Sequence, residues 1–151
     1  MQPGIASILH RDTIAALVGT RTFDRGEACF AAGRVLEVTA AAGELRGVVR
    51  PQDGSRADYA IRIWVRDDGI AYECSCPVGV TRQFCKHAVA LALAHLERER
   101  RDAERGIGVL REALATVTHA ELVDGLVGLA RRDAGLADTL KRLCLDALSR
   151  R

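Results

Sequence analysis

The spacing of apolar residues near the N-terminus predicts two short helices. Apolar side chains recur at intervals of three and four residues up to Val18 and again within 22–32, which is the period of a helix face. Gly19 and Gly33 follow these two segments, and glycine often occupies the position just beyond a helix C-terminus. Asp12 is placed to cap the first of the two helices.

Beyond Gly33 the pattern of apolar and polar residues changes to a period of two. The alternation predicts four strands, at 34–41, 44–50, 57–66 and 70–74, separated by residues that favour turns. Connections this short join antiparallel neighbours, because a parallel pair needs a long crossover. The chain is therefore expected to form an antiparallel meander.

After the meander the pattern becomes helical again. A dense apolar run leads into the charged run 97–105, which predicts one helix from Cys85 to about Arg105, buried in its first half and solvated in its second. Gly106 and Gly108 are expected to break this helix, because glycine destabilises a helix interior.

A helical hairpin is expected at the C-terminal end of the sequence. Thr118 and Glu121 have the spacing of a capping box, in which the two residues satisfy each other's backbone N–H groups. The helix that follows covers 120–132, and a last helix begins at Asp133. The apolar stripes of these helices are interpreted as core, with contact to a partner as the alternative.

Candidate metal ligands lie where the last strand meets the long helix. Cys74 and Cys76 form a C-x-C pair, and Cys85 and His87 form a C-x-H pair. Three thiolates and one imidazole complete a tetrahedral zinc site, and four protein ligands leave no position open for a catalytic water. The sequence predicts one structural Zn²⁺ ion; the alternatives are buried free thiols or a reactive cysteine paired with His87.

The two other cysteines, Cys29 and Cys144, are interpreted as packing residues. Free cysteine is among the most frequently buried residue types; Cys29 falls within a predicted helix, and Cys144 lies beside the apolar stripe of the last helix. Neither cysteine is therefore expected to bind the metal.

The order C-x-C, short loop, C-x-H resembles the SWIM zinc finger, in the form found in small stand-alone bacterial proteins. The segment 23–35 is also similar to the region that precedes the finger in bacterial members, and the C-terminal helices are similar to a segment that often follows it. The resemblance implies a finger core at 72–96. It also implies contact with nucleic acid or protein, since the finger occurs in helicase-type remodelling ATPases, transposases and recombination factors.

Together these elements predict an α+β fold. Short N-terminal helices come first, and a four-stranded antiparallel meander then runs into a zinc-binding finger and its helix. We expect a SWIM zinc finger domain at 1–105 and a C-terminal helical segment at 106–151.

Composition gives little information about the binding partner of the protein, but it does indicate the cell compartment. The net charge is only +2, so bulk charge gives no argument for nucleic acid. Lysine is rare beside arginine and alanine is abundant, which indicates a GC-rich bacterial gene. A metal-type cysteine cluster without a signal-peptide pattern or a long apolar span predicts a cytoplasmic protein.

One face of the predicted sheet combines arginine with the single tryptophan. On the third strand Arg62 and Arg66 flank Trp64, and on the second strand Arg46 and Arg50 fall on the same side. Basic residues around an aromatic ring can hold phosphates and stack on a base. The alternative is a solvated sheet face on which arginine stacks on Trp64 for packing alone.

Two functions follow as hypotheses. The first is binding of nucleic acid, with DNA expected, through these contact residues: Arg46, Arg50, Arg62, Trp64, Arg66, Arg82 and Lys86. The second is a protein–protein adaptor that tethers a helicase-type or other DNA-processing partner. An enzyme is not expected, because the sequence shows no nucleotide-binding glycine loop, no recognisable acid pair and no open metal site. No membrane partner or small-molecule substrate is expected either.

Overall fold

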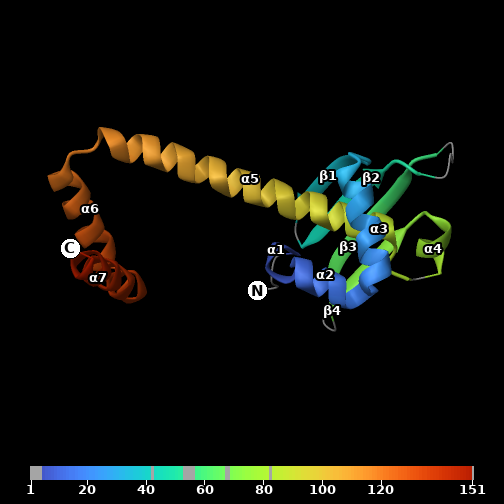
Figure 1. The fold of residues 1–151 in the computed structure, drawn as a ribbon, viewed down its shortest axis with the longest axis horizontal. Helices are drawn as coiled ribbons and strands as arrows, with labels where there is room; N and C mark the ends of the chain where they lie inside the picture. Colours follow the sequence, from blue (N-terminus) through green and yellow to red (C-terminus); the bar gives the residue numbers. More distant parts are fainter. Residues whose placement is uncertain (1–4, 42, 53–56, 67–68, 82, 151) are drawn as a thin grey trace. The chain divides into compact units, whose positions relative to one another are not determined.

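The computed structural model describes residues 5–41, 43–52, 57–66, 69–81 and 83–150. The helices in these ranges are α1 (Ile5–Ile8), α2 (Arg11–Val18), α3 (Thr20–Ala31), α4 (Pro77–Val80), α5 (Lys86–Thr116), α6 (His119–Ala130) and α7 (Ala134–Ser149). The strands are β1 (Val35–Ala41), β2 (Glu44–Val49), β3 (Tyr59–Arg66) and β4 (Gly69–Cys74) (Figure 1). The chain divides into two compact units, 1–102 and 103–151.

The four strands form one antiparallel sheet in the order β1-β2-β3-β4. All four predicted strands are confirmed, with ends that differ from the predicted ones by no more than two residues. The register places Arg46 opposite Arg62 and Leu45 opposite Ile63, so the alternation read from the sequence defines two faces. Leu45, Ile61 and Ile63 face the core, and the arginines face outward.

The first turns of α5 lie between the sheet and α3. A Cβ atom added to Gly47 of β2 would lie 2.2 Å from Cδ1 of Leu91, and one added to Gly26 of α3 would lie 2.4 Å from Cβ of Val89. Val89 and Leu91 point to opposite sides of the helix, because two residues correspond to about 200° of helical turn. This position explains why the first half of α5 is apolar on every side.

The N-terminal helices end where the sequence predicts. Gly19, with φ of 73°, ends α2, and Gly33, with φ of 66°, follows α3. The cap assigned to Asp12 is wrong, because His10 is the N-cap residue of α2 and Asp12 lies inside the first turn. A carboxylate at that position still opposes the positive end of the helix.

Helix α5 is longer than the sequence predicts. It passes through Gly106 and Gly108 without interruption, so the expected break at these residues is wrong. Each glycine costs about 1 kcal/mol relative to alanine, and good helix formers on both sides offset that cost. Ion pairs within one turn also support the charged stretch, where Glu97 contacts both Arg100 and Arg101.

In the unit 103–151, α6 and α7 pack against each other. The capping box is confirmed: the hydroxyl of Thr118 accepts from the Glu121 backbone N–H at 3.3 Å, and the Glu121 carboxylate accepts from the Thr118 N–H at 2.9 Å. Asp133 caps α7 by accepting from the Leu136 N–H at 3.0 Å. The predicted α+β class, with its order of helices, meander and C-terminal helices, is confirmed.

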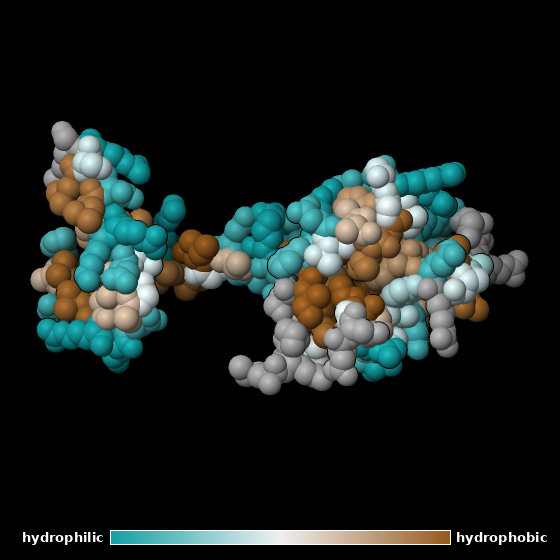
Figure 2. Space-filling view, turned by 90° about the horizontal axis from the view of Figure 1, so that it is seen from below, coloured by the Kyte–Doolittle hydropathy of each residue, from teal (hydrophilic) through white to brown (hydrophobic). Residues whose placement is uncertain are grey.

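No described residue of 103–150 is buried. Eleven large apolar side chains of this unit are exposed: Ile107, Val109, Leu110, Leu114, Val117, Val123, Val127, Leu129, Leu143, Leu145 and Leu148. Figure 2 shows apolar surface on its helices. The core expected beneath these stripes is thus not formed within the described part of the unit.

Among the described helices, none combines the length and the hydropathy that crossing a membrane requires.

Candidate metal centre and the groove beside it

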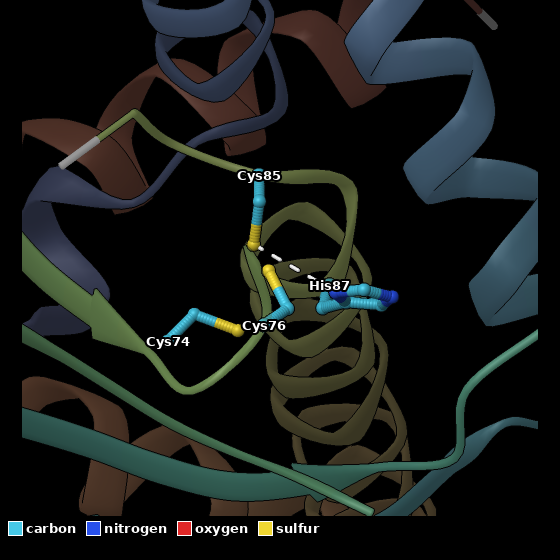
Figure 3. A group of neighbouring side chains, drawn as sticks. All are labelled: Cys74, Cys76, Cys85 and His87. Atoms are coloured by element: carbon cyan, nitrogen blue, oxygen red, sulfur yellow. Dashed lines mark hydrogen bonds between the residues drawn. The ribbon is translucent and has the colours of Figure 1, made fainter. Parts of the chain in front are cut away.

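Four potential metal ligands converge at the junction of β4, α4 and α5. Cys74 ends β4, Cys76 precedes α4, Cys85 precedes α5, and His87 lies in the first turn of α5. All four side chains are buried, and their ligand atoms lie within 4.8 Å of one another. Figure 3 shows the three sulfur atoms and the imidazole directed toward a common point. Within the described residues, no other cluster could hold a metal ion.

The short helix α4 produces the bend between Cys74 and Cys76. On a straight strand, Cys74 and Cys76 would share a face but lie about 6.6 Å apart, which is too far for two sulfur atoms bound to one zinc ion, so the chain turns after β4. Pro77 begins α4, and the backbone N–H of Gly79 donates to Sγ of Cys76 at 3.2 Å. A Cβ on Gly79 would lie 2.5 Å from both Cβ and the carbonyl oxygen of Cys74. The structure therefore requires glycine at position 79 to keep the ligands in place.

The ligand set fits zinc. Tetrahedral Zn²⁺ with Zn–S bonds of about 2.3 Å places its sulfur ligands about 3.8 Å apart. Sγ of Cys85 lies 3.9 Å from Nδ1 of His87, which is the ring nitrogen facing the sulfur atoms. Nε2 of His87 is buried and has no hydrogen-bond partner among the described residues. Coordination through Nδ1 would place the ring proton on Nε2, where it has no hydrogen-bond partner among the described residues.

The thiols differ in acidity before any metal binds. A hydrogen bond from the Cys74 thiol lowers the pKa of Cys85 to about 4. Hydrogen bonds from His87 and from the Ala88 backbone also lower this pKa, whereas burial raises it. The hydrogen bond between Cys74 and Cys85 raises the pKa of Cys74, and burial raises it further. Burial also raises the pKa of Cys76. Zinc binding must therefore displace protons from Cys74 and Cys76.

Aromatic rings surround the site and limit its contact with water. The ring of Tyr59 lies 4.6 Å from that of His87, and Tyr72 packs edge-on against Phe84 at 4.6 Å between centroids. The ring of Tyr59 thereby packs against the imidazole of His87. A buried site with four protein ligands suits a structural ion.

The two other cysteines lie outside the cluster. Cys29 is fully buried in α3, as the sequence predicts, and burial raises the pKa of its thiol. Cys144 is exposed on α7, so its expected packing role is wrong. The helix that carries Cys144 has no described buried residue, which explains the difference.

A groove of about 1090 Å³ lies on the outer face of the sheet, next to the metal centre. It is lined by all four strands and by α4, and it includes four of the predicted contact residues: Arg46, Arg62, Trp64 and Arg66. Arg50 and Lys86 do not line it, and Nζ of Lys86 instead donates to Oε1 of Gln52 at 3.0 Å. Arg82 lies outside the described residues.

The arginines of the outer face are paired with a carboxylate that the sequence analysis missed. Glu44 accepts hydrogen bonds from Arg62, at 2.6 Å, and from Arg46. These two hydrogen bonds, with that of Arg62 the stronger, lower the pKa of Glu44 to about 2. The guanidinium of Arg62 also lies 4.6 Å above the centroid of the Trp64 ring. Glu44 has the same strand parity as Arg46, so the period-two pattern could have placed it on this face.

Further carboxylates line the groove. Glu73 stands opposite Arg62 in the β3–β4 register, and Glu37 stands on β1 in the same groove. Positive and negative side chains are thus mixed across the outer face. The charge pattern read from the sequence counted the arginines alone.

The fold and the ligands define a protein with a closed Cys₃His zinc finger that joins a β-meander to a helix. Residues 62–96 match the family model of the SWIM zinc finger, and this match includes all four ligands. The chain therefore contains a SWIM zinc finger, as its sequence resemblance implied, and its Zn²⁺ ion is structural. Curated proteins and solved structures, when compared with the chain, gave no match.

Proposed function

We propose that this chain is a non-enzymatic binding module whose outer sheet groove binds a strand of nucleic acid, with DNA as the first ligand to test. Zinc holds the end of the meander against the start of α5, and so fixes the strands that line the groove. The observation that carries the proposal is the cluster of Arg46, Arg62 and Arg66 around Trp64 in one groove.

The groove offers both interactions that a single strand needs. Arg46 and Arg66 are exposed and can contact phosphates, which supply most of the affinity of nucleic-acid binding. The guanidinium of Arg62, stacked on Trp64, presents a planar surface on which a base can stack. A phosphate that approaches Arg46 or Arg62 competes with Glu44 for the same N–H donors.

The adaptor function is the second candidate, and the pairing of the arginines favours it. Glu44 neutralises two of the arginines, and Glu37 and Glu73 add further negative charge to the lining. Val80, which is 72% exposed, lies at the α4 end of the same groove. A groove with balanced charges and an apolar end suits an extended peptide of a partner protein.

A binding titration at several salt concentrations tests the first proposal. The zinc-loaded chain is mixed with labelled single- and double-stranded DNA, and affinity is followed by fluorescence anisotropy. Two arginine–phosphate contacts, through Arg46 and Arg66, predict a slope of about −1.4 for log K against log salt on single strands. Arg46→Ala with Arg66→Ala should flatten this slope, and the control Arg25→Ala on α3 should not change it. Absence of binding even at low salt would overturn the proposal.

A second variant separates the two candidates. Glu44→Gln removes the carboxylate that competes with phosphate, so it should strengthen DNA binding. If the charge-balanced groove instead binds a peptide, neither the wild type nor Glu44→Gln should bind DNA. A single protein that the wild-type chain captures and the Glu44→Gln variant does not would support the adaptor function.

A further inference from the structure

The end of α5 carries an apolar stripe with coiled-coil spacing. Ile107, Leu110, Leu114 and Val117 follow one another at intervals of three, four and three residues, which are successive a and d positions of a heptad. All four side chains are between 39% and 59% exposed. A stripe of this kind on a solvated helix has the spacing of a coiled-coil seam.

The exposed apolar surface of the unit 103–151 matches the need of a standard dimer. Full burial of a Leu or Val side chain stabilises by about 1.5–3 kcal/mol at about 25 cal/mol per Å², which corresponds to about 60–120 Å² of apolar area. Eleven such side chains, each about half exposed, offer about 300–700 Å² per chain. A standard interface buries about 800 Å² per partner, and about 60% of that area is apolar.

The charges beside the seam indicate the orientation of the second helix. Glu104 and Arg111 both occupy e positions, seven residues apart, on the same flank of the stripe. In an antiparallel pair of identical helices with its axis between Ile107 and Leu110, Glu104 of each copy faces Arg111 of the other. A parallel pair would bring neither charge opposite its complement.

The residues on the other flank of the stripe, at the g positions, are small. Gly106 occupies a g position, and a Cβ added there would meet nothing within 4 Å. Nothing among the described residues packs against this glycine, although it costs about 1 kcal/mol of helix stability. Ala113 holds the next g position, so two helices can approach closely along this side.

We propose that the surface of α5 formed by Ile107, Leu110, Leu114 and Val117 is a homodimerisation seam, on which a second copy of this chain docks in antiparallel orientation. The exposed apolar residues of α6 and α7 add further apolar surface to the same unit. Each dimer thereby carries two zinc fingers and two sheet grooves.

Sedimentation equilibrium of the full, zinc-loaded chain tests this proposal at concentrations up to about 100 µM. The expected mass is twice the 16.3 kDa of one chain. Leu110→Glu with Leu114→Glu should give the mass of a monomer, with unchanged zinc content as evidence that the finger still folds. The control Val80→Glu introduces the same charge at an exposed apolar residue of the other unit and should leave the dimer intact.

Charge exchange tests the orientation and does not depend on damage to the fold. Glu104→Arg and Arg111→Glu, each alone, should raise the dimer dissociation constant by about four- to thirtyfold, because each creates two like-charge pairs. The double variant Glu104→Arg with Arg111→Glu restores both attractions and should restore the wild-type constant. A double variant weaker than either single one would overturn the antiparallel arrangement. A wild-type chain that stays monomeric, with its apolar stripe covered by its own other unit or by a foreign protein, would overturn the dimer.

Discussion

The substitution Gly79→Ala tests how the finger positions its ligands without removing any of them. Gly79 lies in α4, and its backbone N–H donates to Sγ of Cys76. The added methyl group would stand 2.5 Å from both Cβ and the carbonyl oxygen of Cys74. Since ordinary contacts begin near 3.4 Å, either α4 or Cys74 must move by about 1 Å.

A displacement of that size is large for a metal site. Ligand distances in a zinc site hold to within about 0.2 Å, so a shift of about 1 Å at Cys74 weakens or breaks its bond to the ion. Overpacking of a tight site costs about 1–3 kcal/mol. If the whole cost is borne by the zinc-bound state, zinc affinity falls by about 5- to 150-fold.

Competition with a chromogenic chelator measures this change directly. The expected order is a tight wild-type site, an equally tight Val80→Ala site as the control within the same helix, and a weakened Gly79→Ala site. A Gly79→Ala protein that binds zinc within about twofold of the wild type would refute the reasoning that α4 sets the ligand geometry.

Three further predictions concern the ligands and the core. Cys76→Ser should abolish stoichiometric zinc binding and the cooperative thermal transition of the finger followed by circular dichroism, whereas Cys29→Ala should keep one zinc per chain; metal loss in the second variant would show that the ligand set is wrong. Zinc affinity should rise with pH, by up to about a hundredfold per unit near neutrality, because Cys74 and Cys76 have raised pKa values and must release protons; a chelator titration that gives a pH-independent affinity would contradict this. Gly26→Ala should lower the free energy of unfolding by about 1–3 kcal/mol through contact with Val89, while a denaturation curve equal to the wild type would show that α3 and α5 can separate without cost.

The strands and the metal ligands could be predicted from local pattern because both depend on near neighbours in the sequence. Alternation on β3 set which side of the sheet is buried, and turn residues set the strand ends. The ligand types and their order left few arrangements other than a zinc site. The bend between Cys74 and Cys76 could not be predicted in the same way, because the role of Gly79 depends on its distance from the Cys74 backbone across that bend.

The charge of the outer face could not be predicted from the arginines alone. Glu44 contacts Arg62 across neighbouring strands, and this ion pair depends on the register between β2 and β3. The alternation rule places both residues on one face but does not by itself pair them. The groove is therefore less basic than the sequence suggests.

Helix α5 extends past its predicted end because two glycines are not enough to break it. Gly106 and Gly108 lower helix stability, but the residues around them favour a helix strongly enough to continue it. The apolar stripes beyond this point were interpreted as core, since apolar periodicity alone does not distinguish a core face from a face that binds a second molecule. Only the exposure of Leu110 and Leu114 in the folded chain separates these cases.

The central claim is that Cys74, Cys76, Cys85 and His87 close around one zinc ion between β4 and α5. X-ray absorption at the zinc edge of the purified protein examines that ion and its ligands directly. The account predicts three sulfur atoms at about 2.3 Å and one nitrogen atom at about 2.0 Å, with one zinc per chain. A spectrum with oxygen ligands or fewer than three sulfur atoms would contradict it.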